Sequence, residues 1–146
     1  MKKLFLFLTG LFLAFSTTFS QGSVEGVWKT IDHETGKAKS LVKVYIGPDG
    51  KLYGKIIKLY GYEKPEERIC ENCPAPYTNQ KILGMQIING LTRRGNEWVG
   101  DQLLFAPDRK NYYDAKIWLE DGKLKVRGYI GWFYSTQTWE RATGDL

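Results

Sequence analysis

Histidine and cysteine are nearly missing from this chain of 146 residues, which has one histidine and two cysteines. A tetrahedral zinc site takes four ligands, most often cysteine and histidine, so Cys70, Cys73 and His33 would need a carboxylate to complete one. A Ser-His-Asp or Cys-His arrangement would have to use His33, which stands in the turn-rich stretch DHETGK. No phosphate-binding loop or paired-carboxylate motif is present. We therefore expect no metal, no cofactor and no catalytic residues, although two acids from distant strands could still form an active site.

Long apolar runs are scarce too, and the one that is present lies at the N-terminus. The chain opens MKKLFLFLTGLFLAFSTTFSQG, in which two lysines precede an apolar run over 4–15. About a dozen residues are too few for a membrane-spanning helix, which needs about 20, whereas this order of segments is typical of a signal peptide. We expect residues 1–20 to be removed before Gln21, with an uncleaved anchor as the alternative. The protein is then exported, to the periplasm or the medium, with no transmembrane segment and no lipid anchor.

Positive charge is not concentrated in any one stretch. The full chain has 21 Lys plus Arg against 16 Asp plus Glu; without Lys2 and Lys3 the count is 19 against 16, a net charge of +3. Nucleic-acid binding favours a clustered basic stripe, which the scattered lysines do not form. Removal of 20 residues from 146 leaves 126, the size of one domain with a real core. We expect a single domain over 21–146 that does not bind nucleic acid.

A helical apolar period is absent after the N-terminus, whereas aromatic residues and glycine are frequent, with 5 Trp, 9 Tyr and 16 Gly. Such residues in short alternating runs favour an all-β fold. Tyr113, Ala115, Ile117 and Leu119, for example, share one face of an extended strand. Eight strands are predicted, over residues 26–31, 40–46, 52–60, 85–91, 97–105, 111–119, 123–130 and 134–141.

Eight short strands joined mostly by tight turns favour an antiparallel up-and-down meander. Closure into a barrel removes the exposed sheet edges, and eight strands enclose either a core or one small ligand. A sandwich of two sheets is the main alternative. The first strand carries Gly26-x-Trp28 and the last ends in Arg141, a combination that resembles the lipocalin signature. In that signature the arginine packs on the tryptophan and closes the barrel base, which a cation–π contact favours.

A closer resemblance covers nearly the whole predicted domain. The pieces G-V-W, DGKLYGKI, CENC, ILGMQIINGL, W-V-G, Y-Y-D-A-K, LKVRGYIG and TQTWER follow one another in this order. This ordered set is similar to the exported bacterial family catalogued as domain of unknown function 2147, which is similar to lipocalins in fold. The resemblance implies a lipocalin-like, calycin-type barrel and an exported protein, and it supplies no catalytic residues.

Both cysteines stand in the stretch RICENCPAP, as Cys70 and Cys73. Thioredoxin-type chemistry needs a thiolate at a helix N-terminus, but Pro74 and Pro76 follow directly and oppose a helix. Residues i and i+3 of a β-turn lie within about 7 Å, which overlaps the Cα separation of a disulfide. In an oxidising compartment we expect a Cys70–Cys73 disulfide, and a labile, redox-active disulfide remains the alternative.

The segment 61–84 has no strand pattern and contains three prolines. Loops of this length in a compact domain are usually functional or disordered, and prolines with a disulfide restrict disorder. We expect a shaped lid or rim over one mouth of the barrel. The alternative is a plain crossover that keeps water out of an open end.

The function that these features favour is non-catalytic binding of a small hydrophobic or amphipathic molecule inside the barrel, since apolar walls with a few polar anchors are typical of such sites. The candidate lining residues are Trp98, Tyr113 and Trp132, with Asn89 and Gln102 as polar anchors. One alternative is an envelope interaction or structural protein that uses the loop 61–84 as its contact surface. Another is a periplasmic thiol-redox protein that uses Cys70 and Cys73.

Overall fold

The computed structural model describes residues 22–144, so the predicted signal peptide over 1–20 lies outside the described residues. All eight predicted strands are present, and the predicted barrel is confirmed. The strands are β1 (Gly26–Ile31), β2 (Ala38–Ile46), β3 (Leu52–Leu59), β4 (Gln86–Arg94), β5 (Glu97–Ala106), β6 (Asn111–Glu120), β7 (Lys123–Ile130) and β8 (Phe133–Arg141). A short 3₁₀ helix, η1 (Pro65–Glu67), lies within the loop between β3 and β4. In the described range, no helix is long and apolar enough to cross a membrane.

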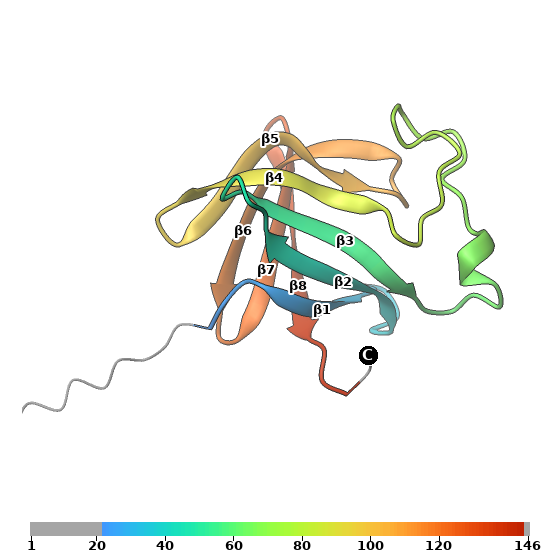
Figure 1. Cartoon of the computed structure of the whole chain (residues 1–146), viewed down its shortest axis with the longest axis horizontal. Helices are drawn as coiled ribbons and strands as arrows, with labels where there is room; N and C mark the ends of the chain where they lie inside the picture. Colours follow the sequence, from blue (N-terminus) through green and yellow to red (C-terminus); the bar gives the residue numbers. More distant parts are fainter. Residues whose placement is uncertain (1–21, 145–146) are drawn as a thin grey trace, which may run out of the picture.

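Each strand pairs antiparallel with the next, and β8 returns to β1 to close the barrel. The connections β1–β2, β3–β4, β5–β6 and β7–β8 therefore lie at one end, which we call the loop end. The remaining turns, the start of β1 and the end of β8 lie at the other, the base end (Figure 1). The long loop 61–84 extends from the loop end as the green segment of Figure 1.

Period-2 alternation on the strands determines which side chains fill the barrel. On β6 and β7 the residues Ala115, Ile117, Leu124 and Val126 face inward and are each at most 5% exposed. Glycine makes room where strands cross closely: a Cβ on Gly54 would lie 2.6 Å from Cδ1 of Ile88. The barrel is therefore filled by packed side chains over most of its length.

β4 contains two places where the register slips by one residue. Gly54 pairs with Ile88 while Lys55 pairs with Gln86, and a second slip follows at Gly90, whose φ is +92°. A bulge adds one residue to one strand and changes which face the next side chain occupies. The first slip lies between Gln86 and Ile88, so it places Gln86 and Asn89 together on the outer face, although three positions separate them.

The seam between β1 and β8 is the shortest pairing in the barrel. Two residue pairs are formed, Trp28 with Arg141 and Lys29 with Glu140, whereas β7 and β8 are paired through seven. Within the described residues, the part of β8 from 133 to 139 has no ladder partner on its β1 side. The wall of the barrel is thus incomplete next to β8 toward the loop end.

Candidate binding site

The structure separates the five predicted ligand-binding residues. Trp98 is buried at 5% exposure and pairs with Ile117, which is fully buried. Trp98 is therefore part of the packed core and does not line an open pocket. Tyr113 also faces inward but lies nearer the loop end, where it is half-buried.

Asn89, Gln102 and Trp132 do not face the interior, so their predicted place on the inner wall is wrong. Bulges place Asn89 on the outer face, and Gln102, at φ +55°, lies in the irregular stretch of β5 between Gly100 and Leu104. The side chain and backbone N–H of Gln102 both donate to Asp114. Trp132 stands in the turn between β7 and β8 and is 97% exposed. Alternation alone could not reveal these three positions.

One surface at the loop end is made by inner-face residues of β6, β7 and β8, and we call it the mouth surface. Its residues are Tyr113, Ile130, Phe133, Ser135 and Gln137. The residue pairs Ile130–Phe133, Gly128–Ser135 and Val126–Gln137 put these four β7 and β8 side chains on the inner face, in line with buried Trp139. Yet Ser135 is exposed, Ile130 is 50% exposed and Phe133 is 82% exposed. The inner face of β7 and β8 is thus open to solvent at the loop end.

Tyr113 forms the floor of the mouth surface. Its Cβ and Cγ lie 3.3 Å from the position that a Cβ on Gly128 would take, so the ring can lie across β7 only because residue 128 has no side chain. Gln137 is a second polar residue of the mouth surface, and its Oε1 accepts a hydrogen bond of 2.9 Å from Nε1 of Trp139. Strict alternation backward from Trp139 would have found Gln137 and Ser135 in the sequence.

At the base end, Arg141 lies over Trp28. The guanidinium carbon is 4.2 Å from the ring centroid, and the two terminal nitrogens donate to the backbone oxygens of Glu25 and Ser23 at 3.1 and 2.7 Å. Trp28 is fully buried, and its Nε1 donates to the backbone oxygen of Val24. This arrangement closes the base, so any ligand would have to enter from the loop end.

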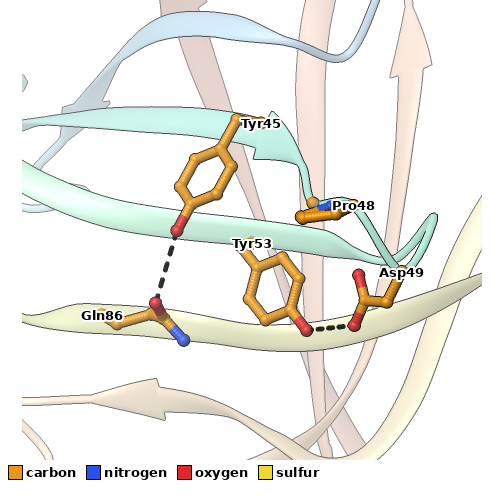
Figure 2. A pocket seen from close by; sticks show the side chains of 6 residues that line it. Tyr45, Pro48, Asp49, Tyr53 and Gln86 are labelled. Atoms are coloured by element: carbon orange, nitrogen blue, oxygen red, sulfur yellow. Dashed lines mark hydrogen bonds between the residues drawn. The ribbon is translucent and has the colours of Figure 1, made fainter.

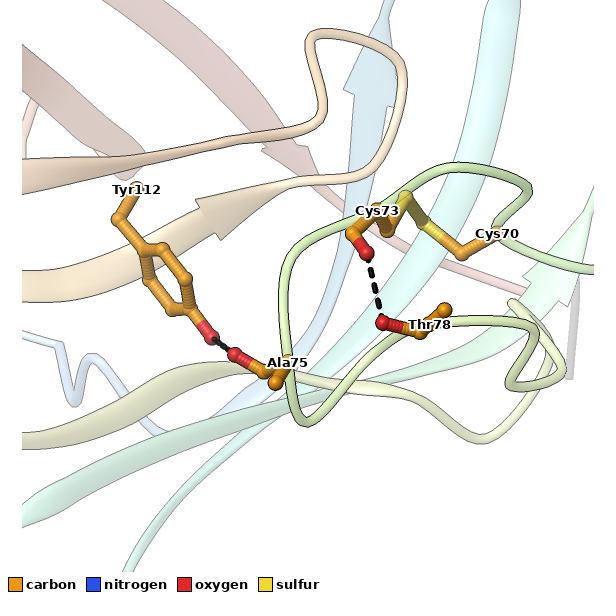
Figure 3. The surroundings of a disulfide bond; sticks show 5 residues. All are labelled: Cys70, Cys73, Ala75, Thr78 and Tyr112. Atoms are coloured by element: carbon orange, nitrogen blue, oxygen red, sulfur yellow. Dashed lines mark hydrogen bonds between the residues drawn. A yellow bond between two sulfur atoms is a disulfide. The ribbon is translucent and has the colours of Figure 1, made fainter.

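The loop 61–84 is held by a disulfide between Cys70 and Cys73, as predicted. Thr78 Oγ1 donates to the backbone oxygen of Cys73 at 2.8 Å, and Tyr112 Oη donates to that of Ala75 at 2.9 Å (Figure 3). The two cysteines are only 2% and 4% exposed. Thiol–disulfide exchange requires access for an attacking thiolate, so this burial disfavours the redox alternative.

Tyr77 attaches the same loop to the outer wall of the barrel. Its ring stacks on Phe105 with centroids 4.1 Å apart, and its hydroxyl donates to the backbone oxygen of Gln86 at 2.7 Å. Asn89 Nδ2 donates to the Tyr77 hydroxyl at 3.0 Å. Burial raises the pKa of Tyr77. Asn89 therefore anchors the loop rather than a ligand, and the loop packs on the side of β4, β5 and β6 instead of capping the interior.

A hollow of about 390 Å³ lies on the outer face near the β2–β3 turn (Figure 2). Tyr45 and Tyr53 stack in it with centroids 5.7 Å apart. The Tyr45 hydroxyl donates to Gln86 Oε1, and that of Tyr53 to Asp49 Oδ2. The hydrogen bond from Tyr53 lowers the pKa of Asp49, and the same bond raises the pKa of Tyr53. Both hydroxyls are therefore already engaged within the protein.

A second hollow, of about 410 Å³, runs along the outer side of β8 next to the incomplete seam. His33 contributes to its lining, with Ile31, Asp32, Gly36, Lys123, Thr136, Thr138 and Glu140. Across residues 22–144, no group of three or more histidine, cysteine, aspartate or glutamate side chains could hold a metal ion.

Comparison with known proteins agrees with this description. No curated protein matches the chain. Among solved structures, the chain is similar to protein HP1028 from the human pathogen Helicobacter pylori, a protein described as belonging to the lipocalin family. The TM-score is 0.68 at 18% identity, over 84% of this chain and 85% of that one, which supports the fold alone. The model of the family described as uncharacterized protein conserved in bacteria, DUF2147, matches residues 26–141. The chain therefore belongs to the bacterial DUF2147 family.

Proposed function

We propose that this protein is a non-catalytic binding protein that takes a small, partly apolar ligand at the mouth surface, after export to the periplasm or the medium. The observation that supports this most directly is the exposure of Ser135. This residue is on the inner face of the barrel, beside Gly128 and Tyr113, and yet it is open to solvent. An inner face that is exposed at one end of an otherwise filled barrel leaves apolar and polar side chains accessible to a ligand.

The chemistry of the mouth surface suits an amphipathic molecule. Ile130 and Phe133 offer apolar area, while Ser135 and Gln137 offer hydroxyl and amide groups. Sites for small molecules combine apolar walls with a few polar groups that fix orientation. Since the base end is closed by Trp28 and Arg141, the ligand would bind shallowly, above the packed core.

The test is titration of the purified protein with a lipophilic fluorescent probe, followed by native mass spectrometry of protein from its own host. Ser135→Trp would fill the mouth surface and should weaken probe binding by about tenfold or more. Lys43→Trp is the matched control, because Lys43 is an exposed residue on the outer face of β2. Equal binding by the wild type and Ser135→Trp would reject this site.

A second candidate function is protein contact in the cell envelope through the loop 61–84. The loop is held in one shape by its disulfide and by Tyr77, and it presents Tyr62 at 48% and Ile69 at 37% exposure. Tyr77→Ala would release the loop from the barrel wall. If the loop is the contact surface, this change should abolish capture of a partner by cross-linking in cells and leave probe binding at the mouth unchanged.

A further inference from the structure

The tip of the β7–β8 hairpin is the most exposed apolar feature in the described part of the chain. Trp132 is 97% exposed, Phe133 82%, Tyr134 61% and Ile130 50%. Aromatic side chains bury about 150–250 Å² each when they are covered, so the tip presents several hundred Å² of apolar surface. Patches of that size on a monomer usually mark an interaction site.

The hairpin holds the tip rigidly away from the barrel. Ile130 and Phe133 form the last pair of a β7–β8 ladder that is regular over its whole length. Gly131, at φ +55°, makes the tight turn possible. Tyr129 and Tyr134 pack against each other just below, with ring centroids 5.8 Å apart. The regular two-stranded ladder holds the tip in place, and the exposed side chains of Trp132 and Phe133 are not part of the packed core of the barrel.

A cation without a carboxylate partner lies directly behind the tip. The guanidinium of Arg127 is 4.4 Å from the ring of Tyr134 and 5.1 Å from that of Trp118, and its Nε donates to Thr136. Among residues 22–144, neither terminal nitrogen of Arg127 has a hydrogen-bond or ion-pair partner. The other two basic residues of this β7 face are engaged, Lys123 with Glu140 and Lys125 with Glu120.

Asp114, an acidic residue on the neighbouring strand β6, makes no ion pair with Arg127 among residues 22–144. Asp114 pairs across the ladder with Tyr129, but its Oδ1 accepts hydrogen bonds from the backbone and side chain of Gln102, at 2.8 and 3.0 Å. The tip therefore combines exposed aromatic rings with a guanidinium on the same hairpin that has no carboxylate partner among residues 22–144. Tyrosine and tryptophan favour the boundary between lipid chains and headgroups, and arginine can reach lipid phosphates from an apolar position.

We propose that the tip 130–134 inserts into the surface of an anionic lipid bilayer, with Trp132 and Phe133 among the upper acyl chains and Arg127 at the phosphate level. A second copy of this chain packed tip to tip is less consistent with the structure, because it would bring the same apolar and basic groups together without a carboxylate for Arg127. The proposal does not depend on ligand binding at the mouth surface.

The experiment is co-sedimentation of the purified protein with phosphatidylcholine vesicles, with and without phosphatidylglycerol, together with tryptophan fluorescence. Trp28, Trp98 and Trp139 are each at most 5% exposed and Trp118 is half-buried, so comparison with Trp132→Phe is needed to assign a change on vesicle addition to Trp132. We expect co-sedimentation and a blue shift with the anionic vesicles, and weaker binding without phosphatidylglycerol. Failure of the wild type to co-sediment with anionic vesicles would overturn the proposal.

The wild type and all variants should begin at the same residue, so that a difference in vesicle binding reports only on the substituted side chain. Trp132→Ser/Phe133→Ser should weaken binding by about tenfold or more, and Trp132→Phe should keep binding but lose the blue shift. Arg127→Gln should remove the preference for phosphatidylglycerol. Tyr62→Ser, an exposed tyrosine in the long loop, should leave vesicle binding unchanged, which ties the binding to the tip.

Two results with these variants would count against the tip. Equal vesicle binding by Trp132→Ser/Phe133→Ser and the wild type would overturn the proposal. A second contrary result would be a wild-type dimer, seen by light scattering, that is absent in the double variant and that vesicles do not dissociate. The tip would then be covered by a second copy of the chain.

Discussion

Arg141, the last residue of β8, lies over Trp28 of β1 with its guanidinium carbon 4.2 Å from the ring centroid. The same guanidinium donates to two backbone oxygens ahead of β1, those of Ser23 and Glu25. One side chain thus covers the buried indole and also fixes the segment that enters the first strand. The planar group with several donors is what makes both interactions possible at once.

We expect Arg141→Ala to lower the free energy of unfolding by about 1–2 kcal/mol, since it removes a cation–π contact and two hydrogen bonds. Arg141→Lys should recover only part of this, because an ammonium cannot stack and donate in the same geometry. Urea unfolding followed by tryptophan fluorescence measures the difference. Arg109→Ala, in the exposed β5–β6 turn, is the control and should change stability by less than about 0.5 kcal/mol. A similar loss in both variants would contradict a specific role for Arg141.

The disulfide should matter to the loop far more than to the barrel. Closing so short a ring is worth about 2 kcal/mol on the chain-entropy model, and both cysteines lie within the loop that the ring shapes. Cys70→Ala/Cys73→Ala should therefore speed amide hydrogen exchange over residues 68–82 and leave exchange in β6 and β7 unchanged. Faster exchange in β6 and β7 as well would mean that the loop supports the whole fold.

The close packing of the interior predicts that adding one methyl group will be costly. A Cβ on Gly54 would lie 2.6 Å from Cδ1 of Ile88, so Gly54→Ala should lower the free energy of unfolding by about 1–3 kcal/mol through overpacking. Ile88→Val removes that Cδ1 and alone should cost about 0.5–1.5 kcal/mol. In the double variant the two losses should add to less than their sum, as a double-mutant cycle will reveal. If the two losses of unfolding free energy simply add, the added methyl group at residue 54 does not press on Cδ1 of Ile88.

The pair formed by Asp49 and Tyr53 predicts a pH effect at the low end. The hydrogen bond from Tyr53 lowers the pKa of Asp49, with a smaller contribution from the backbone N–H of Lys51. A carboxyl whose pKa is lower in the folded protein stabilises the fold above the unfolded-state pKa, about 3.9, and this stabilisation is lost as pH falls through the folded pKa.

The measurement is an NMR titration of the side-chain carboxyl carbons. Tyr53→Phe should raise the pKa of Asp49 toward its ordinary value. It should leave unchanged the pKa of Asp32, which is lowered mainly by hydrogen bonds from Thr35. An unchanged pKa of Asp49 in Tyr53→Phe would show that the tyrosine is not the cause.

The barrel could be predicted from the sequence because local signals act on each strand separately. Period-2 alternation and tight turns place β1 at 26–31 and β7 at 123–130, the ranges found in the structure. β4 continues to Arg94, past the predicted end at residue 91, because polar residues can extend a strand without any apolar signal.

The binding residues were harder to predict, because a bulge reverses the face of every residue beyond it. Asn89 and Gln102 follow such irregularities, so counting by two assigns them to the wrong side. Trp132 was mistaken for a wall residue because a turn residue carries no alternation of its own. The exposure of Ser135 depends on where β1 stops pairing with β8, which is a long-range property that no local pattern contains.

The short seam between β1 and β8 also bears on the order in which the molecule folds. Its contacts join residues far apart in the chain, such as Arg141 and Glu25, which are 116 positions apart, whereas every other ladder joins consecutive strands. Contacts of large sequence separation carry the greatest loop-closure entropy and tend to limit folding rates. With only two residue pairs to offset that entropy, the seam is the junction that we expect to form last, after a curved sheet of eight strands has already assembled.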